Sequence, residues 1–130
     1  MDVKNSILIV DDDSSNLLEL FHILRSSYDI STAKNGESAL KRAAENVPDL
    51  ILLDVIMPDM SGLDVIKELK KSDTTKSIPV ILITGLSGES DISDGLEAGA
   101  VDYIRKPFSS DDVINSVKEQ IEIINTKNSK

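Results

Sequence analysis

Three short aliphatic runs, separated by stretches with helical periodicity, limit the folds open to this chain. The runs are "ILIV" (residues 7–10), "LILL" (50–53) and "VILI" (80–83). Continuous runs rich in β-branched residues are typical of parallel strands that are buried on both faces. Two further segments, "YDIST" (28–32) and "AVDYI" (100–104), alternate apolar and polar residues, which favours less covered edge strands.

In the segments that connect these predicted strands, apolar residues recur with the period of an amphipathic helix that buries one face. The positions are Leu17, Leu20, Phe21 and Leu24, then Ala39, Leu40, Ala43 and Ala44, then Leu63, Ile66 and Leu69, then Ile92, Leu96 and Gly99, and finally Val113, Val117, Ile121 and Ile124. We therefore predict five strand-helix units in alternation.

Alternating units of this length predict a parallel sheet with right-handed crossovers and helices on both faces. With the two alternating segments at the edges, the strand order is 2-1-3-4-5, a known order of doubly wound sheets. The predicted fold class is α/β: a single doubly wound (βα)5 domain of the flavodoxin-like type with a parallel five-stranded sheet. We expect the domain to span residues 1–124, with 125–130 as a polar tail or the start of a linker.

The segment "LSGESDISDGLEAGA" (86–100) is the weakest of the predicted helices. It contains Gly88 and Gly95 and is rich in serine and aspartate. Glycine in the middle of a helix costs ~1 kcal/mol relative to alanine. We therefore expect this helix to be marginal.

Composition and charge exclude several classes of function. Fourteen basic against 23 acidic side chains give a formal net charge of −9, so no direct binding of nucleic acid or of a membrane surface is expected. The chain has no Cys and a single His, His22, which excludes disulfides, thiol catalysis and a zinc site built from these residues. The sequence shows neither an apolar signal core nor a membrane-spanning run, and we expect a cytoplasmic protein.

Polar and charged residues gather where the predicted strands end. Asp11 and Asp12 follow the first strand, Asp54 the third, Thr84 the fourth and Lys106 the fifth. Parallel strands of a doubly wound fold end at one edge of the sheet, and ligands bind there at the switch point, here between strands one and three. We therefore expect these side chains to form one site.

The acidic members of this predicted site repel one another. Two carboxylates about 5 Å apart repel by ~3 kcal/mol at an effective dielectric constant of 20. A divalent cation would relieve this repulsion, and Mg²⁺ prefers a few carboxylates together with waters and phosphate oxygens. Asp13, the third aspartate of the run, falls on the next turn, where we expect a first-turn or capping acid of the following helix.

Four motifs occur in the order and spacing of a known family: "ILIVDDD" (7–13), "LILLDVIMPDMSG" (50–62), "LIT" (82–84) and "YIRKPF" (103–108). With them the chain closely resembles the receiver domain of bacterial two-component response regulators, from about Ser6 to Ile124. One acidic pair after a strand would be weak evidence, whereas five matching positions on five strand ends are specific. The resemblance implies a phosphoacceptor domain of a two-component system or phosphorelay.

The resemblance makes Asp54 the phosphoacceptor, which attacks the phosphoryl group of a partner's phosphohistidine and becomes an acyl phosphate. Asp11 and Asp12 match the metal-binding acids, and in the family the metal is also bound by Asp54 and by the backbone carbonyl at Ile56. The implied ion is Mg²⁺, with Mn²⁺ able to replace it. The implied domain is not an enzyme, apart from accepting its own phosphoryl group and slowly losing it.

The resemblance also assigns residues that respond to phosphorylation. Thr84 matches the hydroxyl that hydrogen-bonds the new phosphoryl group, and Lys106 the ammonium that pairs with it. Tyr103 matches the aromatic that turns inward when the threonine moves; a half-buried edge-strand aromatic is the alternative interpretation. The family's Lys-Pro bond, here Lys106-Pro107, is commonly cis. These changes would switch the surface of the fourth helix, fifth strand and fifth helix.

The side chains two residues after Asp54 and two after Thr84 flank the phosphoryl group in this family and influence the approach of water. Here they are Ile56 and Leu86, which are bulky and cannot hydrogen-bond a water molecule. We therefore expect the phosphoryl group to be long-lived.

The implied partner is a sensor histidine kinase or a histidine phosphotransfer protein. A covalently linked output domain or a separate protein partner would receive the signal. Ser116 stands where winged-helix regulators of the OmpR type usually place an arginine for dimerisation, which argues against that particular dimer.

Two other functions are conceivable for a fold of this type, but the same residues fit them less well. A haloacid-dehalogenase-type phosphatase needs an acid two positions after its nucleophilic aspartate, and that position is Ile56. A flavodoxin-like FMN carrier needs a Ser/Thr/Gly phosphate loop after strand one, where Asp11, Asp12 and Asp13 would repel the phosphate. A receiver fits these positions better than either alternative.

Overall fold

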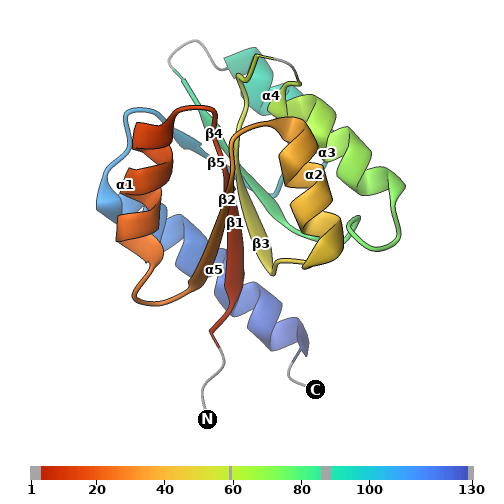
Figure 1. Cartoon of the computed structure of the whole chain (residues 1–130). Coiled ribbons are helices and arrows are strands. Elements are labelled where there is room, and N and C mark those ends of the chain that lie inside the picture. Colours follow the sequence, from red (N-terminus) through yellow and green to blue (C-terminus); the bar gives the residue numbers. More distant parts are fainter. Residues whose placement is uncertain (1–3, 59, 86–88, 129–130) are drawn as a thin grey trace.

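The computed structural model describes residues 4–58, 60–85 and 89–128, and this part of the chain contains five strand-helix units (Figure 1). The strands are β1 (Ser6–Val10), β2 (Asp29–Ala33), β3 (Leu50–Asp54), β4 (Val80–Thr84) and β5 (Asp102–Arg105). The helices are α1 (Ser14–Leu24), α2 (Gly36–Glu45), α3 (Gly62–Lys71), α4 (Glu89–Ala98) and α5 (Ser110–Asn128). The predicted alternation of strands and helices is confirmed.

The five strands form one parallel sheet in the predicted order β2-β1-β3-β4-β5. Every residue of β3 and β4 is buried, whereas β2 and β5 at the edges are only partly covered. The chain moves outward in one direction from β1 to β2 and in the other from β3 to β5. The loops that leave β1 and β3 therefore run in opposite directions, and the carboxyl ends of these two strands form the switch point at which doubly wound folds bind their ligands.

Helices cover both faces of the sheet, with α1 and α5 on one side and α2, α3 and α4 on the other (Figure 1). Successive residues of a strand point to opposite faces, so each central strand contributes to two aliphatic cores. The core under α1 and α5 takes Ile7, Ile9, Leu50, Leu52, Ile81 and Ile83, and the opposite core takes Leu8, Val10, Ile51, Leu53, Val80 and Leu82. This double coverage explains why the three central runs are continuously aliphatic.

Both edge strands begin slightly later than the sequence pattern predicts. The N–H of Tyr28 donates to the carbonyl oxygen of Leu24, so Tyr28 still belongs to the turn that ends α1. The N–H of Ala100 likewise donates to the carbonyl oxygen of Gly95 and closes the end of α4, where Gly99 has a φ of 122°. These turn hydrogen bonds occupy the backbone groups that a longer edge strand would use.

The last helix, α5, continues to Asn128, so residues 125–128 of the polar C-terminal segment are helical. The side-chain amide of Asn5 donates to the side-chain oxygen of Asn125 at 3.1 Å, which joins this end of α5 to the segment before β1. The division between a domain at 1–124 and a tail or linker remains a prediction. Within the described ranges, none of the helices is long and apolar enough to cross a membrane.

Two glycines allow helices to approach the sheet closely. A Cβ atom at Gly95 would overlap the side chain of Leu82, so the residue that weakens α4 by propensity also lets α4 pack on β4. A Cβ atom at Gly62 would lie 2.5 Å from the carbonyl oxygen of Asp54 and 2.9 Å from the Cα atom of Val55. The start of α3 is therefore packed directly on the end of β3.

Gly62→Ala should destabilise the fold by about 2 kcal/mol, because rigid backbone atoms already occupy the space of the new methyl group. This loss should outweigh the gain of about 1 kcal/mol in helix propensity. Gly95→Ala should cost less, because the Leu82 side chain can move. Gly85→Ala is the control, since a Cβ atom there meets nothing within 4 Å. Urea unfolding followed by circular dichroism measures all three variants, and equal stability of Gly62→Ala and Gly85→Ala would contradict the packing argument.

Candidate functional site

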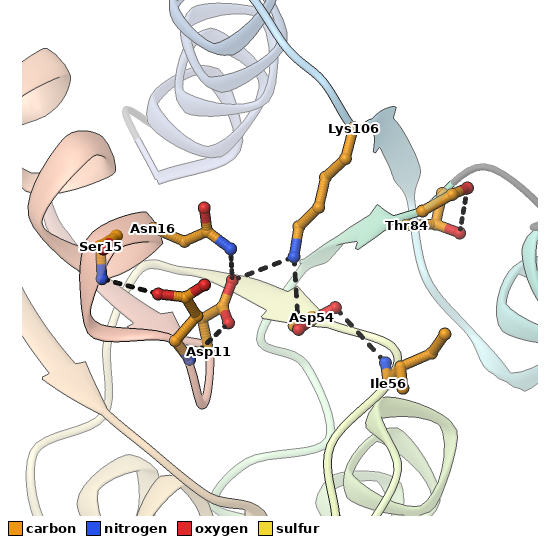
Figure 2. Close-up of polar contacts among 9 residues, drawn as sticks. Asp11, Ser15, Asn16, Asp54, Ile56, Thr84 and Lys106 are labelled. Carbon is orange, nitrogen blue, oxygen red and sulfur yellow. Dashed lines mark hydrogen bonds and ion pairs between the residues drawn. The ribbon is translucent and has the colours of Figure 1, made fainter.

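The ends of β1, β3 and β5 bring two buried carboxylates and one ammonium group together (Figure 2). The Nζ atom of Lys106 lies 3.3 Å from Oδ2 of Asp11 and 3.4 Å from Oδ2 of Asp54. Asp11 is 1% exposed and Asp54 is 5% exposed. Lys106 thus pairs with two acids at once, and the three side chains form one charged cluster.

The Asp11 carboxylate accepts hydrogen bonds from the loop and helix that follow it. Its Oδ1 atom accepts from the N–H of Asp13 at 2.9 Å, and its Oδ2 atom accepts from Nδ2 of Asn16 at 3.1 Å. Asp13 is the N-cap of α1, because its side chain accepts from the N–H of Ser15 at 2.8 Å. The predicted capping role of Asp13 is confirmed, whereas Asn16 was not anticipated.

Asp54 is the last residue of β3, and the packing of Gly62 on its carbonyl oxygen fixes its backbone. The side chain accepts a hydrogen bond on Oδ1 from the N–H of Ile56 at 3.3 Å. Burial raises the pKa of Asp54 from its ordinary 3.8 to about 6, and the nearby charge of Asp11 adds to this rise. Lys106 and the Ile56 N–H act in the opposite direction but do not cancel it.

Lys106 follows β5, and its peptide bond to Pro107 is cis. Partial burial acts to lower the pKa of Lys106, but the attraction of Asp54 and Asp11 outweighs it, so the pKa lies above 10.5. Lys106 is therefore a permanent positive charge in the cluster. It compensates only part of the negative charge of the acids around it.

Asp12 completes a group of acids that suits a metal ion. One carboxylate oxygen from each of Asp11, Asp12 and Asp54 lies within 4.8 Å of the other two. Asp11 and Asp54 are buried, whereas Asp12 is exposed. Hard divalent cations prefer oxygen ligands of this kind, so the three residues fit a site for such an ion.

Thr84 and Tyr103 lie away from this cluster. The hydroxyl of Thr84 donates to the carbonyl oxygen of Gly85 at 3.5 Å, and Figure 2 shows it apart from Asp54 and Lys106. Tyr103 is 38% exposed on β5, with the guanidinium carbon of Arg105 5.9 Å from its ring centroid. In this conformation Tyr103 has the outward orientation of an edge-strand aromatic.

Ile56 and Leu86 are the two side chains predicted to influence hydrolysis, and the structure describes the first of them. The Ile56 side chain is 62% exposed beside the cluster, although its backbone N–H contacts Asp54. Leu86 lies outside the described residues.

Residues 7–118 match the family model described as the response regulator receiver domain. The chain belongs to this family. Response regulator PleD of Caulobacter vibrioides is 49% identical over 109 residues, which is 83% of this chain and 24% of PleD. The alkaline phosphatase synthesis transcriptional regulatory protein PhoP of Bacillus subtilis is 42% identical over 117 residues, 89% of this chain and 48% of PhoP.

Among solved structures, a putative response regulator from Chloroflexus aurantiacus has a TM-score of 0.88 and 33% sequence identity. The match covers 92% of this chain and 99% of that one. The chain described here spans about a quarter of PleD and about half of PhoP. It is thus a receiver domain, a phosphoacceptor module of two-component signalling, and the activities of the longer relatives belong to those proteins.

Asn16 is the receiver-site residue that sequence reasoning missed. The available signal was its position five residues after Asp11, in the first turn of the predicted helix and therefore close to the end of the preceding strand. The periodicity of apolar residues gives no information on a polar residue such as Asn16, and helix propensity ranks asparagine only as a poor helix former. Its contact with Asp11 depends on the exact direction of α1, which the pattern does not specify.

The raised pKa of Asp54 makes the stability of the metal-free receiver domain depend on pH. Between about pH 4 and pH 6 the folded state still holds the proton, whereas the unfolded chain has released it. Stability should therefore fall as the pH rises through this window and level off above it. Asp54→Asn cannot titrate, so its advantage in unfolding free energy over the parent should grow by about 2 kcal/mol from pH 4 to pH 7.

Urea unfolding in EDTA at several pH values measures this difference between the two proteins. A difference that stays constant from pH 4 to pH 7 would show that the burial of Asp54 does not disfavour its charged form.

Proposed function

We propose that this receiver domain accepts a phosphoryl group on Asp54 from a phosphohistidine of a partner protein. The observation that supports this assignment is the position of Asp54 in a buried cluster with Asp11 and Lys106 at the carboxyl ends of parallel strands. Asp54 ends the central strand β3, and it lies beside the switch point where doubly wound folds bind their ligands.

Asp54 acts as the nucleophile in this proposal. With a pKa of about 6, about nine-tenths of its carboxyl groups are ionised at pH 7. A bond forms between a carboxylate oxygen of Asp54 and phosphorus while the P–N bond of the phosphohistidine breaks, and the electron pair of that bond stays on the imidazole nitrogen. The product is an acyl phosphate on Asp54, so the chain stores the group and performs no turnover on other substrates.

Asp11, Asp12 and Asp54, with the backbone carbonyl of Ile56, would hold the metal ion, which we assign as Mg²⁺ with Mn²⁺ able to replace it. The carboxylate oxygens within 4.8 Å of one another support the first three ligands. When bound, the ion offsets the negative charge that the phosphoryl group brings. Lys106 already lies 3.4 Å from Asp54, and we assign it to pair with an oxygen of the new phosphoryl group.

Thr84 and Tyr103 are the proposed responding residues. The Thr84 hydroxyl would turn from the Gly85 carbonyl to the phosphoryl group, and Tyr103 would turn inward from its exposed position on β5. The surface formed by α4, β5 and α5 would then change. The partners would be a sensor histidine kinase or histidine phosphotransfer protein upstream and an output domain or protein downstream, and this domain would act in the cytoplasm.

The acceptor assignment is tested with acetyl phosphate in the presence of Mg²⁺, followed by intact mass spectrometry. The parent should gain the mass of one phosphoryl group, and Asp54→Ala should gain none. Asp11 is also buried beside Lys106, but its two oxygens are held by hydrogen bonds from the N–H of Asp13 and the amide of Asn16, so it should not replace Asp54 as the nucleophile. Asp29→Ala, at the exposed start of β2, is the control and should be labelled like the parent. Equal labelling of Asp54→Ala and the parent would refute the assignment.

The lifetime of the phosphoryl group is the second prediction from this function. Ile56, exposed beside Asp54, and Leu86 cannot orient a water molecule, and positioning of the nucleophile is most of what a protein contributes to phosphoryl transfer. Ile56→Asn combined with Leu86→Glu should therefore speed the loss of the group at least about tenfold, which requires only ~1.4 kcal/mol of barrier.

Decay of the phosphorylated protein after donor removal, at constant Mg²⁺, measures this rate. Ile56→Val combined with Leu86→Val is the apolar control and should decay slowly. If the polar double variant decays no faster than the parent, these two side chains do not control the water.

A further inference from the structure

We propose that Asn16 is a positioning residue of the acidic cluster, and this inference rests on the proposed function. Its side-chain amide holds the Asp11 carboxylate in the orientation that binds the metal ion, and it keeps this hold when Lys106 turns toward a phosphoryl group on Asp54.

The first support is the set of donors around Asp11. Oδ1 accepts from the N–H of Asp13 at 2.9 Å, and Oδ2 accepts from both Asn16 and Lys106, at 3.1 and 3.3 Å. Figure 2 shows the amide and the ammonium reaching the same oxygen from different elements, α1 and the segment after β5. A carboxylate that is 1% exposed needs such donors, because burial of an unpaired charge is costly.

The second support is that the two donors to Oδ2 differ in their other contacts. Lys106 is shared with Asp54, whose Oδ2 atom lies 3.4 Å from the same ammonium nitrogen. A phosphoryl group on Asp54 adds a charge of about −2 and would draw the ammonium away from Asp11. For Asn16, the contact with Asp11 is the side-chain hydrogen bond found among the described residues, so nothing else in this set competes for it.

The third support is the charge of the donor. The Asn16 amide is neutral, so it fixes the carboxylate without adding a positive charge that would repel a metal ion. Asn16 and Lys106 occupy the two lone pairs of Oδ2, whereas Oδ1 accepts only from the N–H of Asp13 and keeps a lone pair for a ligand bond. Partners of this kind, which orient metal-binding side chains, commonly change metal affinity by tenfold or more when they are removed.

The register of α1 places Asn16 correctly. Asp13 caps the helix, and Leu17 and Leu20 bury the adjacent face in the core, so the first turn cannot rotate freely. Asn16 is the third residue of α1 and is partly buried, with its short side chain directed back at the end of β1.

A purely structural role for Asn16 makes a different prediction. Asparagine is a weak helix former, so replacement by leucine or glutamine would then leave the metal site unchanged and would stabilise α1 slightly. A positioning role predicts weaker metal binding whatever happens to the stability of the helix. The metal affinity of the unphosphorylated domain therefore separates the two.

The test is a Mg²⁺ titration of the parent, Asn16→Leu, Asn16→Gln and Ser15→Ala, followed by amide NMR shifts of the cluster. Asn16→Leu should raise the dissociation constant for Mg²⁺ about tenfold. Asn16→Gln keeps the donor on a longer side chain and should recover part of the loss. Ser15→Ala is the matched control in the same turn, since the hydrogen bond of Ser15 runs from its backbone N–H to the helix cap Asp13 and not to the cluster, and it should bind like the parent.

Labelling by acetyl phosphate at subsaturating and saturating Mg²⁺ provides the second measurement. Asn16→Leu should label about tenfold more slowly at low Mg²⁺, and high Mg²⁺ should restore much of the rate. Asn16→Ser, whose side chain is too short to reach Asp11, replaces Asn16→Leu if urea unfolding shows that the leucine variant does not fold.

An Mg²⁺ dissociation constant equal to the parent's in Asn16→Leu, or in Asn16→Ser, would overturn the positioning role. Failure of the proposed function looks different. In that case the parent itself would bind no Mg²⁺, or Asp54→Ala would be labelled as well as the parent.

Discussion

The pairing of one ammonium group with two buried carboxylates is the interaction on which the rest of this structure depends. Asp11 follows β1 and Asp54 ends β3, and a charge buried without a partner in such a position would strongly destabilise the fold. The compensating group comes from beyond β5, at the far edge of the sheet, where Lys106 reaches both acids. The parallel topology makes this possible, because it places the carboxyl ends of sequence-distant strands along one edge.

Lys106 neutralises only part of the negative charge of the cluster, and the chemistry of the site follows from the negative charge that remains. One positive charge faces three carboxylates once the exposed Asp12 is included, so the cluster keeps a net negative charge. The raised pKa of Asp54 has the same origin, since burial and the charge of Asp11 exceed the effect of Lys106. A site in this condition would gain stability by taking up a cation, and a bound cation would favour the approach of an anionic phosphoryl group.

Much of the fold and the centre of the site could be predicted, because both follow from strong one-dimensional patterns. The runs 7–10, 50–53 and 80–83 are continuous because two helical layers cover them, and alternation marks the edges correctly. What could not be predicted depends on three-dimensional approach. In the sequence, Gly95 is only a residue that weakens a helix, because its close approach to Leu82 becomes visible only in the structure. Asn16 is likewise an ordinary first-turn residue in the sequence, because its hydrogen bond to Asp11 depends on where α1 lies. The outward orientation of Tyr103 is a side-chain rotation, which neither periodicity nor spacing encodes.

The distribution of contacts around the cluster indicates which side of the domain can respond. On the side of β1 and β3, Asp11 accepts hydrogen bonds from Asp13 and Asn16, and Gly62 packs against the backbone of Asp54, so movement there would break several interactions at once. On the side of β4 and β5, Thr84 has a long hydrogen bond of 3.5 Å, and Tyr103 lies exposed at the edge with the Arg105 guanidinium 5.9 Å from its ring. Contacts of this kind cost little to exchange, because water can replace most of them. The structural response to a phosphoryl group should therefore travel toward β5 and its neighbouring helices, while the half of the site proposed to bind the metal ion stays in place.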